Sequence, residues 1–295
     1  MSDQNDLLPQ ANGRIAFQGE IGAFSHQACA EVFPAMEPMP CATFEDAIAA
    51  TRGGTANLAM LPIENSIHGR VADIHQLLPG SGLYIVAEHF VPIRLQLLAH
   101  PGLKLEEVAE AQSHPVALAQ CRQFLRAHGI RAVTGVDTAG SAKFVAEAPS
   151  GHRAAIASRL AAAEYGLDVV AADIEDADHN TTRFLVMSRQ RIEADPAAEA
   201  VVTSFVFEVR NVPAALYKAM GGFATNGVNM TKLESYMVNG SFTATEFYAE
   251  VDGHPEQPAL RRALDELKFF TNELRILGVY QAHPYRKHAA GGSAV

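Results

Sequence analysis

The sequence predicts an α/β protein with two domains, and three features carry that prediction. Strand-like and helix-like segments alternate from residue 14 to residue 188, which is typical of a mostly parallel sheet covered by helices on both faces. A linker-like stretch with Pro196 and several alanines follows. A shorter strand-helix-strand-strand-helix-strand series then ends near residue 281. The length of 295 residues agrees with about two domains.

Helix caps and apolar periodicity place the elements of the first domain. We expect Ser25, Thr43, Thr138 and Ser158 to begin helices, because each polar side chain stands at the start of a helical pattern. The expected strands are 14–18, 58–61, 83–90, 93–99, 133–136, 154–157 and 182–188, and the other expected helices are 67–78 and 115–129. Glu64-Asn65-Ser66 then lies between a strand end and a helix start, where open α/β sheets bind ligands.

The second domain has the order of a ferredoxin-like βαββαβ unit. Its expected strands are 203–209, 228–237, 242–251 and 274–279, and its expected helices are 214–226 and 258–271. Asn239-Gly240 is a strong signal for the hairpin between the second and third strands. We expect the tail from His283 to fray.

The composition excludes several classes of protein. Lysine and arginine number 23 and aspartate and glutamate number 33, so the formal net charge is 23 − 33 = −10; without a basic run, the chain is not expected to bind nucleic acid. Cys29, Cys41 and Cys121 form no Cys-x-x-Cys pair and are expected as reduced core thiols. No segment has the ~18 consecutive apolar residues of a membrane span, and the polar start lacks a secretory signal. We expect a cytoplasmic protein without membrane contact.

Three motifs follow one another along the first domain. They are Pro62-Ile63-Glu64-Asn65-Ser66, Ser113-His114-Pro115 followed by Gln120-Cys121, and Asn180-Thr181-Thr182-Arg183-Phe184. On these motifs the sequence resembles the prephenate dehydratases of the monofunctional bacterial type, over residues 14–281. The resemblance implies a catalytic domain over 14–189 with two α/β lobes similar to type II periplasmic binding proteins, a linker over 190–202 and an ACT regulatory domain over 203–281. It also implies that the substrate binds in a cleft between the lobes.

The reaction implied by the resemblance is the decarboxylative dehydration of prephenate to phenylpyruvate, a carbon-oxygen lyase step of L-phenylalanine biosynthesis. The elimination needs a proton or hydrogen bond at the departing oxygen and restraint of the ring. We therefore expect no metal and no cofactor. Consistently, the sequence contains no Gly-x-Gly-x-x-Gly run and no Walker-type loop.

The resemblance names Thr182 as essential. Because a threonine hydroxyl is a weak acid, we expect it to give a positioned hydrogen bond to the leaving hydroxyl; outside the motif, Thr181 and Thr182 would simply be β-branched strand residues. Glu64 competes for the role, since a carboxyl beside a bound dianion would be held protonated and could act as the acid. Alternatively, Glu64 is only an acid at a helix start, stabilised by the dipole.

Other polar residues are expected to bind the substrate. The guanidinium of Arg183 can bind both oxygens of a substrate carboxylate. Alternatively, it pairs with an acid of the chain such as Asp178. Helix starts could add positive potential. In full, the expected catalytic residues are Thr182, Glu64, Asn65, Ser113 and Gln120, and the expected substrate-binding residues are Arg183, Phe184, Ser66, Thr138, Ser25 and Asn180. His68, His114 and His179 lie near the motifs and could titrate in the cleft.

For the second domain, the resemblance implies regulation by L-phenylalanine. The family's Pro-Gly-Ala-Leu loop stands here as Pro213-Ala214-Ala215-Leu216, and its Glu-Ser-Arg-Pro segment as Glu234-Ser235-Tyr236-Met237. Ala214 thus replaces a glycine and Tyr236 a cation. The expected phenylalanine-binding residues are Asn211, Ala214, Ala215, Leu216, Asn229, Glu234 and Ser235. The alternative is a dimerisation module that has lost its ligand.

Two other functions remain open from the sequence. Arogenate dehydratase acts on a substrate with an amino group where prephenate has a ketone, and no residue separates the two activities. A non-catalytic amino-acid-binding sensor would also use a lobed fold and an ACT domain, although the intact motif from Asn180 to Phe184 argues against it. We expect a homodimer or homotetramer, because ferredoxin-like sheet edges tend to be covered.

Overall fold

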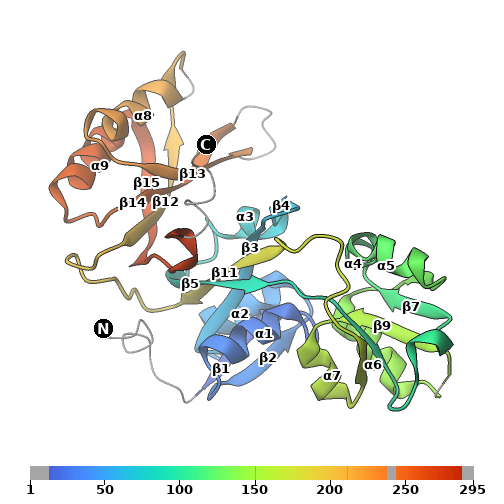
Figure 1. Ribbon diagram of the computed structural model, residues 1–295. Coiled ribbons are helices and arrows are strands. Elements are labelled where there is room, and N and C mark those ends of the chain that lie inside the picture. Colours follow the sequence, from blue (N-terminus) through green and yellow to red (C-terminus); the bar gives the residue numbers. More distant parts are fainter. Residues whose placement is uncertain (1–12, 150, 211, 238–243, 288–295) are drawn as a thin grey trace. The chain divides into compact units, whose positions relative to one another are not determined.

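The computed structural model describes residues 13–149, 151–210, 212–237 and 244–287 (Figure 1). The chain packs as two compact units. Within the described residues, the first unit comprises 13–74 and 89–184, and the second comprises 75–88 and 185–287. The first unit has two lobes, whose strands belong to different sheets.

The first lobe is built on a parallel set of strands in the order β2-β1-β3, with β11 beside β3. Its elements are β1 (Arg14–Gln18), α1 (Phe24–Val32), β2 (Glu37–Cys41), α2 (Phe44–Gly53), β3 (Leu58–Asn65), β4 (Gly69–Arg70) and the first residues of β11 (Thr181–Ser188). Helices α1 and α2 pack against β1 and β3. The apolar residues of β1 and β3 are fully buried, as expected for strands of a parallel sheet.

Two of the four expected helix caps are confirmed. Thr43 caps α2 by accepting the Asp46 N–H at 3.1 Å, and Ser158 caps α7 (Arg159–Tyr165) by accepting the Ala161 N–H at 3.1 Å. The other two expectations are wrong. The cap of α1 is Ala23, so Ser25 lies within the first turn. The cap of α6 (Thr138–Glu147) is Asp137, so Thr138 is the first helical residue.

The segment expected as a helix over 67–78 is a turn, a short strand and a shorter helix. β4 pairs antiparallel with the end of β3, and α3 (Ala72–Leu77) follows. Gly69 has a φ of 76°, which suits a turn and not a helix. The apolar spacing that predicted one helix therefore runs through two elements.

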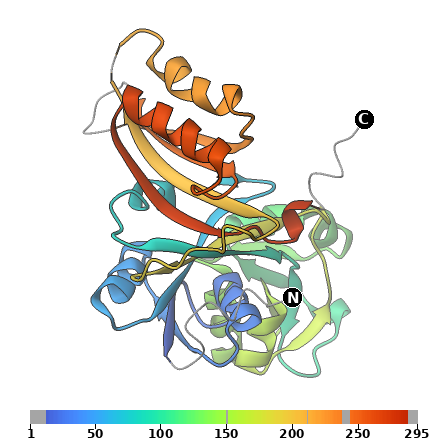
Figure 2. The same ribbon diagram turned by 90° about the vertical axis from the view of Figure 1, so that its left-hand side faces the viewer.

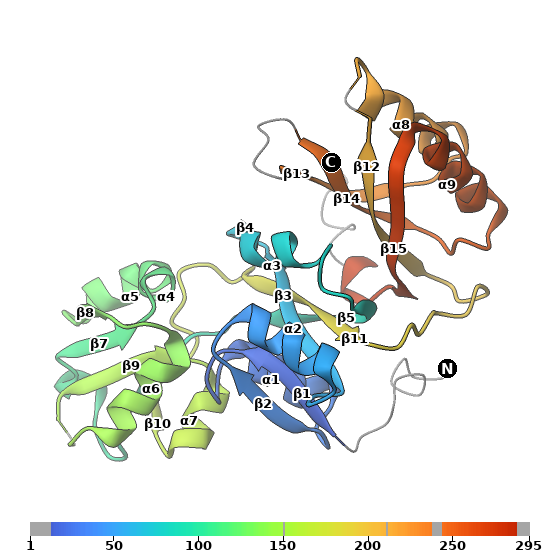
Figure 3. The ribbon, with the colours of Figure 1, turned by 180° about the vertical axis from the view of Figure 1, so that it is seen from behind.

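The second lobe holds a five-stranded sheet in the order β10-β6-β9-β7-β8. Its elements are β6 (Gln96–Ala99), η2 (Leu105–Glu107), β7 (Glu110–Ser113), α4 (Pro115–Gln120), α5 (Arg122–Ala127), β8 (Arg131–Thr134), α6 (Thr138–Glu147), β9 (Arg153–Ala157), α7 (Arg159–Tyr165) and β10 (Asp168–Ala171). Helices α4 and α5 lie on one face of the sheet, and α6 and α7 lie on the other (Figure 3). Ser158 Oγ also donates to the Gly22 carbonyl of the first lobe at 2.6 Å.

The second unit confirms the expected βαββαβ order. Its elements are β12 (Val201–Val209), α8 (Ala215–Thr225), β13 (Met230–Met237), β14 (Ala244–Asp252), α9 (Pro258–Phe270) and β15 (Thr271–Gln281), and the strand order is β13-β14-β12-β15. Both helices cover one face of this sheet (Figure 2). Leu260, Leu264 and Leu267 of α9 are buried in its core, as the spacing predicted. The hairpin signal at Asn239-Gly240 lies outside the described residues.

Residues 283–287, after β15, make defined contacts, in contrast to the fraying expected from His283; residues 288–295 lie outside the described residues. The His283 N–H donates to Glu88 Oε1 at 2.9 Å, and Arg286 binds the same carboxylate. Glu88 lies on β5 (Tyr84–Pro92), which pairs in parallel with β15 at Ile85 and Gly278. Charged contacts that the local sequence does not reveal therefore hold the tail. Among the described residues, no helix has the length and apolar character needed to span a membrane.

Candidate active site

The side-chain amide of Asn65, at the end of β3, anchors the site. Its Oδ1 accepts hydrogen bonds of 3.0 Å from the backbone N–H groups of Ile67 and His68. Because a backbone N–H can only donate, the oxygen of the amide must face this turn and Nδ2 must face away from it. The turn after β3 therefore determines the orientation of the amide.

Asn65 Nδ2 donates to Asn180, which directly precedes β11, and to Thr182, the second residue of that strand. It lies 2.7 Å from Asn180 Oδ1 and 3.0 Å from Thr182 Oγ1. Asn180 is 3% exposed, and Thr182 is half-buried. Since Thr182 Oγ1 accepts a bond from the amide, its own O–H proton can be donated to another group. The first and third motifs meet because β3 and β11 are neighbouring strands.

Gln120 brings the second motif to the same place. Helix α4 ends at this residue, because the Gln120 carbonyl accepts the Asp176 N–H at 2.6 Å and the Asp176 carboxylate accepts the Gln123 N–H at 3.1 Å. Gln120 Oε1 accepts from Asn180 Nδ2 at 3.1 Å, and its Nε2 lies 2.8 Å from His68 Nε2. These two contacts join the lobes. The two Asp176 contacts explain why the helix expected over 115–129 is broken.

Ser66 holds the loop that precedes β11. Its Oγ donates to the His179 carbonyl at 2.7 Å and accepts the Thr181 N–H at 2.9 Å, while the Ser66 N–H donates to the Thr181 carbonyl at 2.9 Å. The hydroxyl expected to bind substrate is thus engaged with backbone groups. It keeps the loop beside the Asn65 turn.

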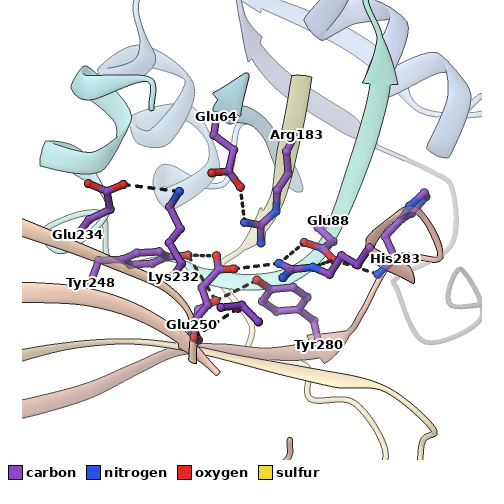
Figure 4. A network of polar contacts seen from close by, with 12 residues as sticks. Glu64, Glu88, Arg183, Lys232, Glu234, Tyr248, Glu250, Tyr280 and His283 are labelled. Carbon is purple, nitrogen blue, oxygen red and sulfur yellow. Dashed lines mark hydrogen bonds and ion pairs between the residues drawn. The ribbon is translucent and has the colours of Figure 1, made fainter. Parts of the chain in front are cut away.

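Arg183 forms an ion pair with Glu64, and these labelled side chains point toward each other in Figure 4. Arg183 Nη1 lies 2.9 Å from Glu64 Oε1; the Arg183 side chain is 3% exposed and that of Glu64 is 30% exposed. The guanidinium also lies 6.0 Å from the centre of the Phe90 ring. Arg183 thus pairs with an acid of the chain, Glu64. Its binding of a substrate carboxylate stays a prediction.

Four of the predicted site residues lie outside this cluster. Ser113 Oγ is buried and donates to the Ile156 carbonyl at 2.6 Å, inside the second lobe. Phe184 is 1% exposed and belongs to the core. Ser25 and Thr138 lie in the first turns of α1 and α6. A surface pocket of about 260 Å³ in the second lobe is lined by none of the predicted site residues.

One of the three histidines near the motifs contacts the cluster. His114 Nδ1 accepts the Val116 N–H at 3.3 Å and so caps α4. The His179 ring is 73% exposed and lies 3.6 Å from Asp178. His68, by contrast, contacts Gln120. The sequence carried only one signal for this role, the position of His68 two residues after the first motif.

Neither a metal site nor a disulfide is found in the described part of the chain. Within those residues, no group of three or more His, Cys, Asp or Glu side chains could hold a metal ion. Cys29, Cys41 and Cys121 are free thiols; Cys29 and Cys121 are buried and Cys41 is half-buried. Burial raises the pKa of both buried thiols, which disfavours the nucleophilic thiolate.

The second unit contains a buried cluster of charges, which can be followed through the labelled Glu88 and Glu250 in Figure 4. The side chains of both glutamates are 0% exposed. Arg286 donates to Glu88 Oε1 at 2.6 Å, to Glu88 Oε2 at 2.8 Å and to Glu250 Oε2 at 2.9 Å. The Tyr248 hydroxyl donates to Glu250 Oε1 at 2.5 Å. Arg286 therefore binds two strands, β5 and β14.

The predicted phenylalanine-binding residues lie on several elements of the second unit. Ala214 caps α8 and has a φ of 60° and a ψ of 21°, a left-handed conformation that favours glycine. Ala215 and Leu216 form the first turn of α8 and pack on the core of the unit. Asn229 donates to Asp252 Oδ2 at 2.7 Å.

The remaining predicted residues of this set lie in or near β13. Glu234 and Ser235 are in β13, and Lys232 Nζ lies 3.7 Å from Glu234 Oε1. The Tyr236 hydroxyl, at the position of the family's cation, lies 2.8 Å from His75 Nδ1. Asn211 lies outside the described residues.

Fold and site define an α/β protein whose motif residues meet as a cluster of amides and a hydroxyl at the junction of two lobes. The family model for prephenate dehydratase matches residues 15–192. The chain therefore belongs to the prephenate dehydratase family, whose members are lyase-type enzymes.

Named relatives agree with this assignment. The bifunctional N-acyl-homoserine lactone acylase/prephenate dehydratase of Komagataeibacter europaeus is 50% identical over 92% of this chain and 97% of that protein. Arogenate dehydratase 2 of Petunia hybrida is 36% identical over 90% of this chain and 71% of that protein. The crystal structure of prephenate dehydratase from Arthrobacter aurescens in complex with L-Phe has 32% identity and a TM-score of 0.83, and the match covers 95% of this chain and 96% of that one.

Proposed function

We propose that the chain converts prephenate to phenylpyruvate, with release of water and carbon dioxide, in L-phenylalanine biosynthesis. The observation that carries this proposal is the hydrogen bond from Asn65 to Thr182, because it orients a hydroxyl of the third motif with an amide of the first. Gln120 of the second motif supports the same cluster through Asn180. The matched family model covers all three motifs. We place the substrate between the two lobes, beside Thr182.

Thr182 is proposed to stabilise the departing hydroxyl. Its oxygen accepts from Asn65, so its proton is available for a hydrogen bond to the leaving oxygen while the carboxylate is lost as carbon dioxide and the ring becomes aromatic. Asn65, Asn180 and Gln120 hold this hydroxyl in place. A donor fixed before reaction costs no reorganisation when the carbon-oxygen bond breaks.

The charged residues take supporting roles in this proposal. Arg183 forms an ion pair with Glu64, and we assign the hydrogen bond to the leaving oxygen to Thr182 and not to Glu64. The pair instead ties the neighbouring strands β3 and β11 together. For the substrate carboxylates, we propose the backbone N–H groups in the first turns of α1 and α6, where Ser25 and Thr138 lie.

An assay with two substrates tests the activity. Purified chain should release phenylpyruvate from prephenate, and Thr182→Val should lose most of the turnover. Arogenate is the second arm, because a relative at 36% identity is named arogenate dehydratase. Phenylalanine formed from arogenate at a higher kcat/KM would reverse the substrate assignment. Binding of either compound without turnover would instead support a sensor and overturn the proposal.

A second activity is proposed on one observation. A relative that is 50% identical over nearly its whole length is named as an acylase for N-acyl-homoserine lactones as well as a prephenate dehydratase. If this chain shares that activity, it should hydrolyse the amide of such a lactone to a fatty acid and homoserine lactone. Mass spectrometry of both products tests it, and the product balance excludes simple opening of the lactone ring.

For the second unit, we propose an ACT regulatory domain over 203–281 that binds L-phenylalanine, joined by a linker over 190–202 to a catalytic domain over 14–189. Two observations support it: the βαββαβ order, and the left-handed conformation of Ala214 at the position of the family's glycine. The Arthrobacter relative was crystallised with L-Phe. We also propose that the protein is cytoplasmic and forms a homodimer or a homotetramer.

Calorimetry tests the regulatory site. Phenylalanine should release heat on binding, and Ala214→Gly should bind it more tightly, because glycine lets backbone approach the ligand more closely. A chain that shows no heat at millimolar phenylalanine but stays dimeric would support the alternative, a dimerisation module without a ligand.

A further inference from the structure

A chain of side-chain hydrogen bonds leads from Thr182 to His68. Asn65 Nδ2 donates to Thr182 Oγ1 and Asn180 Oδ1, Asn180 Nδ2 donates to Gln120 Oε1, and Gln120 Nε2 lies 2.8 Å from His68 Nε2. His68 belongs to the first lobe and Gln120 to the second. The last contact of the chain therefore bridges the lobes.

The donor and the acceptor of every hydrogen bond in this series follow from the backbone groups at its start. The N–H groups of Ile67 and His68 can only donate, so Asn65 must present its oxygen to them and its nitrogen to Asn180. Asn180 then accepts a hydrogen bond at Oδ1 and donates one from Nδ2. The acceptor of this second bond must be an oxygen, which is Gln120 Oε1. The nitrogen of Gln120 remains for His68. Since an amide nitrogen only donates, His68 Nε2 must accept.

We infer that His68 is a positioning residue of the site: its ring carries a proton on Nδ1 and accepts the Gln120 amide at Nε2. This acceptor holds Gln120 in the one orientation that lets Asn180 and Asn65 keep theirs. The oriented Asn65 in turn holds the Thr182 hydroxyl. This inference rests on the proposed dehydratase function, because it assigns His68 a role in that site.

Without an acceptor at position 68, the side-chain amide of Gln120 can flip, so that its oxygen and nitrogen exchange positions. The turned amide would present its nitrogen to Asn180 Nδ2, so two donors would face each other and the contact would be lost. Asn180 could then rotate and present a nitrogen to Asn65 as well. The Thr182 hydroxyl would keep its place in the fold but lose the fixed partner that directs its proton.

Kinetics of two variants test the role. His68→Leu removes the acceptor, and we expect kcat to fall about tenfold, or about 1.4 kcal/mol, with a smaller change in KM. His68→Gln can place an oxygen near the position of Nε2 and should recover most of the lost kcat. His128→Leu, an exposed histidine after α5, is the matched control and should leave kcat unchanged. His68 is exposed, so thermal unfolding of all three variants should stay near that of the wild type.

The tautomer gives a test that does not depend on turnover. Long-range ¹H–¹⁵N spectra, with His68→Gln used for assignment, should show an unprotonated Nε2 and a protonated Nδ1 for His68. A protonated Nε2 would overturn the inference, as would a wild-type kcat in His68→Leu. If the wild type itself forms no phenylpyruvate, the proposed function fails and this role fails with it; an active wild type with an active His68→Leu contradicts only the role of His68.

Discussion

Asn65 and Thr182 are 117 residues apart in the sequence, yet Asn65 Nδ2 lies 3.0 Å from Thr182 Oγ1. The contact exists because β3 and β11 are neighbours in the sheet and each carries its motif at the end that faces the second lobe's Gln120. It turns an ordinary threonine hydroxyl into an oriented donor, and the first prediction follows from it.

Thr182→Val removes the hydroxyl and keeps the β-branched shape. We expect kcat for phenylpyruvate formation to fall at least about 100-fold, because a preorganised donor contributes on that scale to transition-state stabilisation. The fold should change little, since valine suits a strand. Thr134→Val, an exposed strand residue of the second lobe, is the control and should keep full activity. Equal turnover in both variants would remove Thr182 from the mechanism.

Arg286→Ala should destabilise the second unit strongly. Glu88 and Glu250 are fully buried, and loss of the guanidinium deprives both carboxylates of charged hydrogen bonds. Breaking a buried pair in this way costs about 3–5 kcal/mol. Lys287→Ala is the control one residue later: its pair with Glu199 is exposed, so this variant should unfold at nearly the same urea concentration as the wild type. Urea unfolding followed by circular dichroism measures both, and similar midpoints for the two variants would contradict this account.

The three cysteines should differ in reactivity toward iodoacetamide. Burial raises the pKa of the Cys29 and Cys121 thiols, and burial together with the nearby Asp46 carboxylate also raises the pKa of Cys41. Cys41 is nevertheless partly accessible, so it should be alkylated first in the folded protein. Peptide mass mapping identifies the modified residue. Folded Cys41→Ser should resist the reagent; fast alkylation of Cys121 in that variant would disprove the burial argument.

Glu110 should make stability depend on pH. A hydrogen bond from Arg153, with a further contribution from Arg131, lowers the pKa of this carboxyl below its ordinary value of 4.5. The unfolded state therefore takes up a proton before the folded state does, and the stabilisation is present above about pH 4.5 and is lost as the pH falls through the lower folded pKa.

Glu110→Gln measures this contribution. The variant should melt below the wild type at neutral pH, and the difference should shrink on acidification. Glu37→Gln, which alters the exposed pair with Arg14, should show a much smaller difference at neutral pH. A Glu110→Gln gap that grows toward acid would reverse the assigned sign.

Local sequence signals predicted local structure well where one residue decides it. Thr43 and Ser158 are caps because each directly precedes the first helical turn. Ser25 and Thr138 stand one or two residues too late, and Ala23 and Asp137 have the extended backbone that a cap needs. Residue preference alone does not separate neighbouring positions.

Distant contacts decided what the sequence left open. The helix after Pro115 stops at Gln120 because Asp176, from a loop more than 50 residues later, binds both sides of the break. Arg183 pairs with Glu64, which is distant in the sequence, because the strands β3 and β11 are neighbours in the sheet. No periodicity in either segment reports such a pairing.

By itself, the sequence predicted the alternation of strands and helices, the βαββαβ series and the three motifs of the family, because these depend on neighbouring residues and on composition. It missed the strands β2, β4, β7 and β10. Only the tertiary structure decided how the motifs work together. It decided how the side-chain amides of Asn65, Asn180 and Gln120 are oriented, and that Arg183 pairs with Glu64. It also placed His68 at the end of the series of hydrogen bonds that begins at Thr182. The reason is physical. A hydrogen bond has a donor and an acceptor at fixed distance, and that geometry exists only once strands far apart in the chain lie side by side.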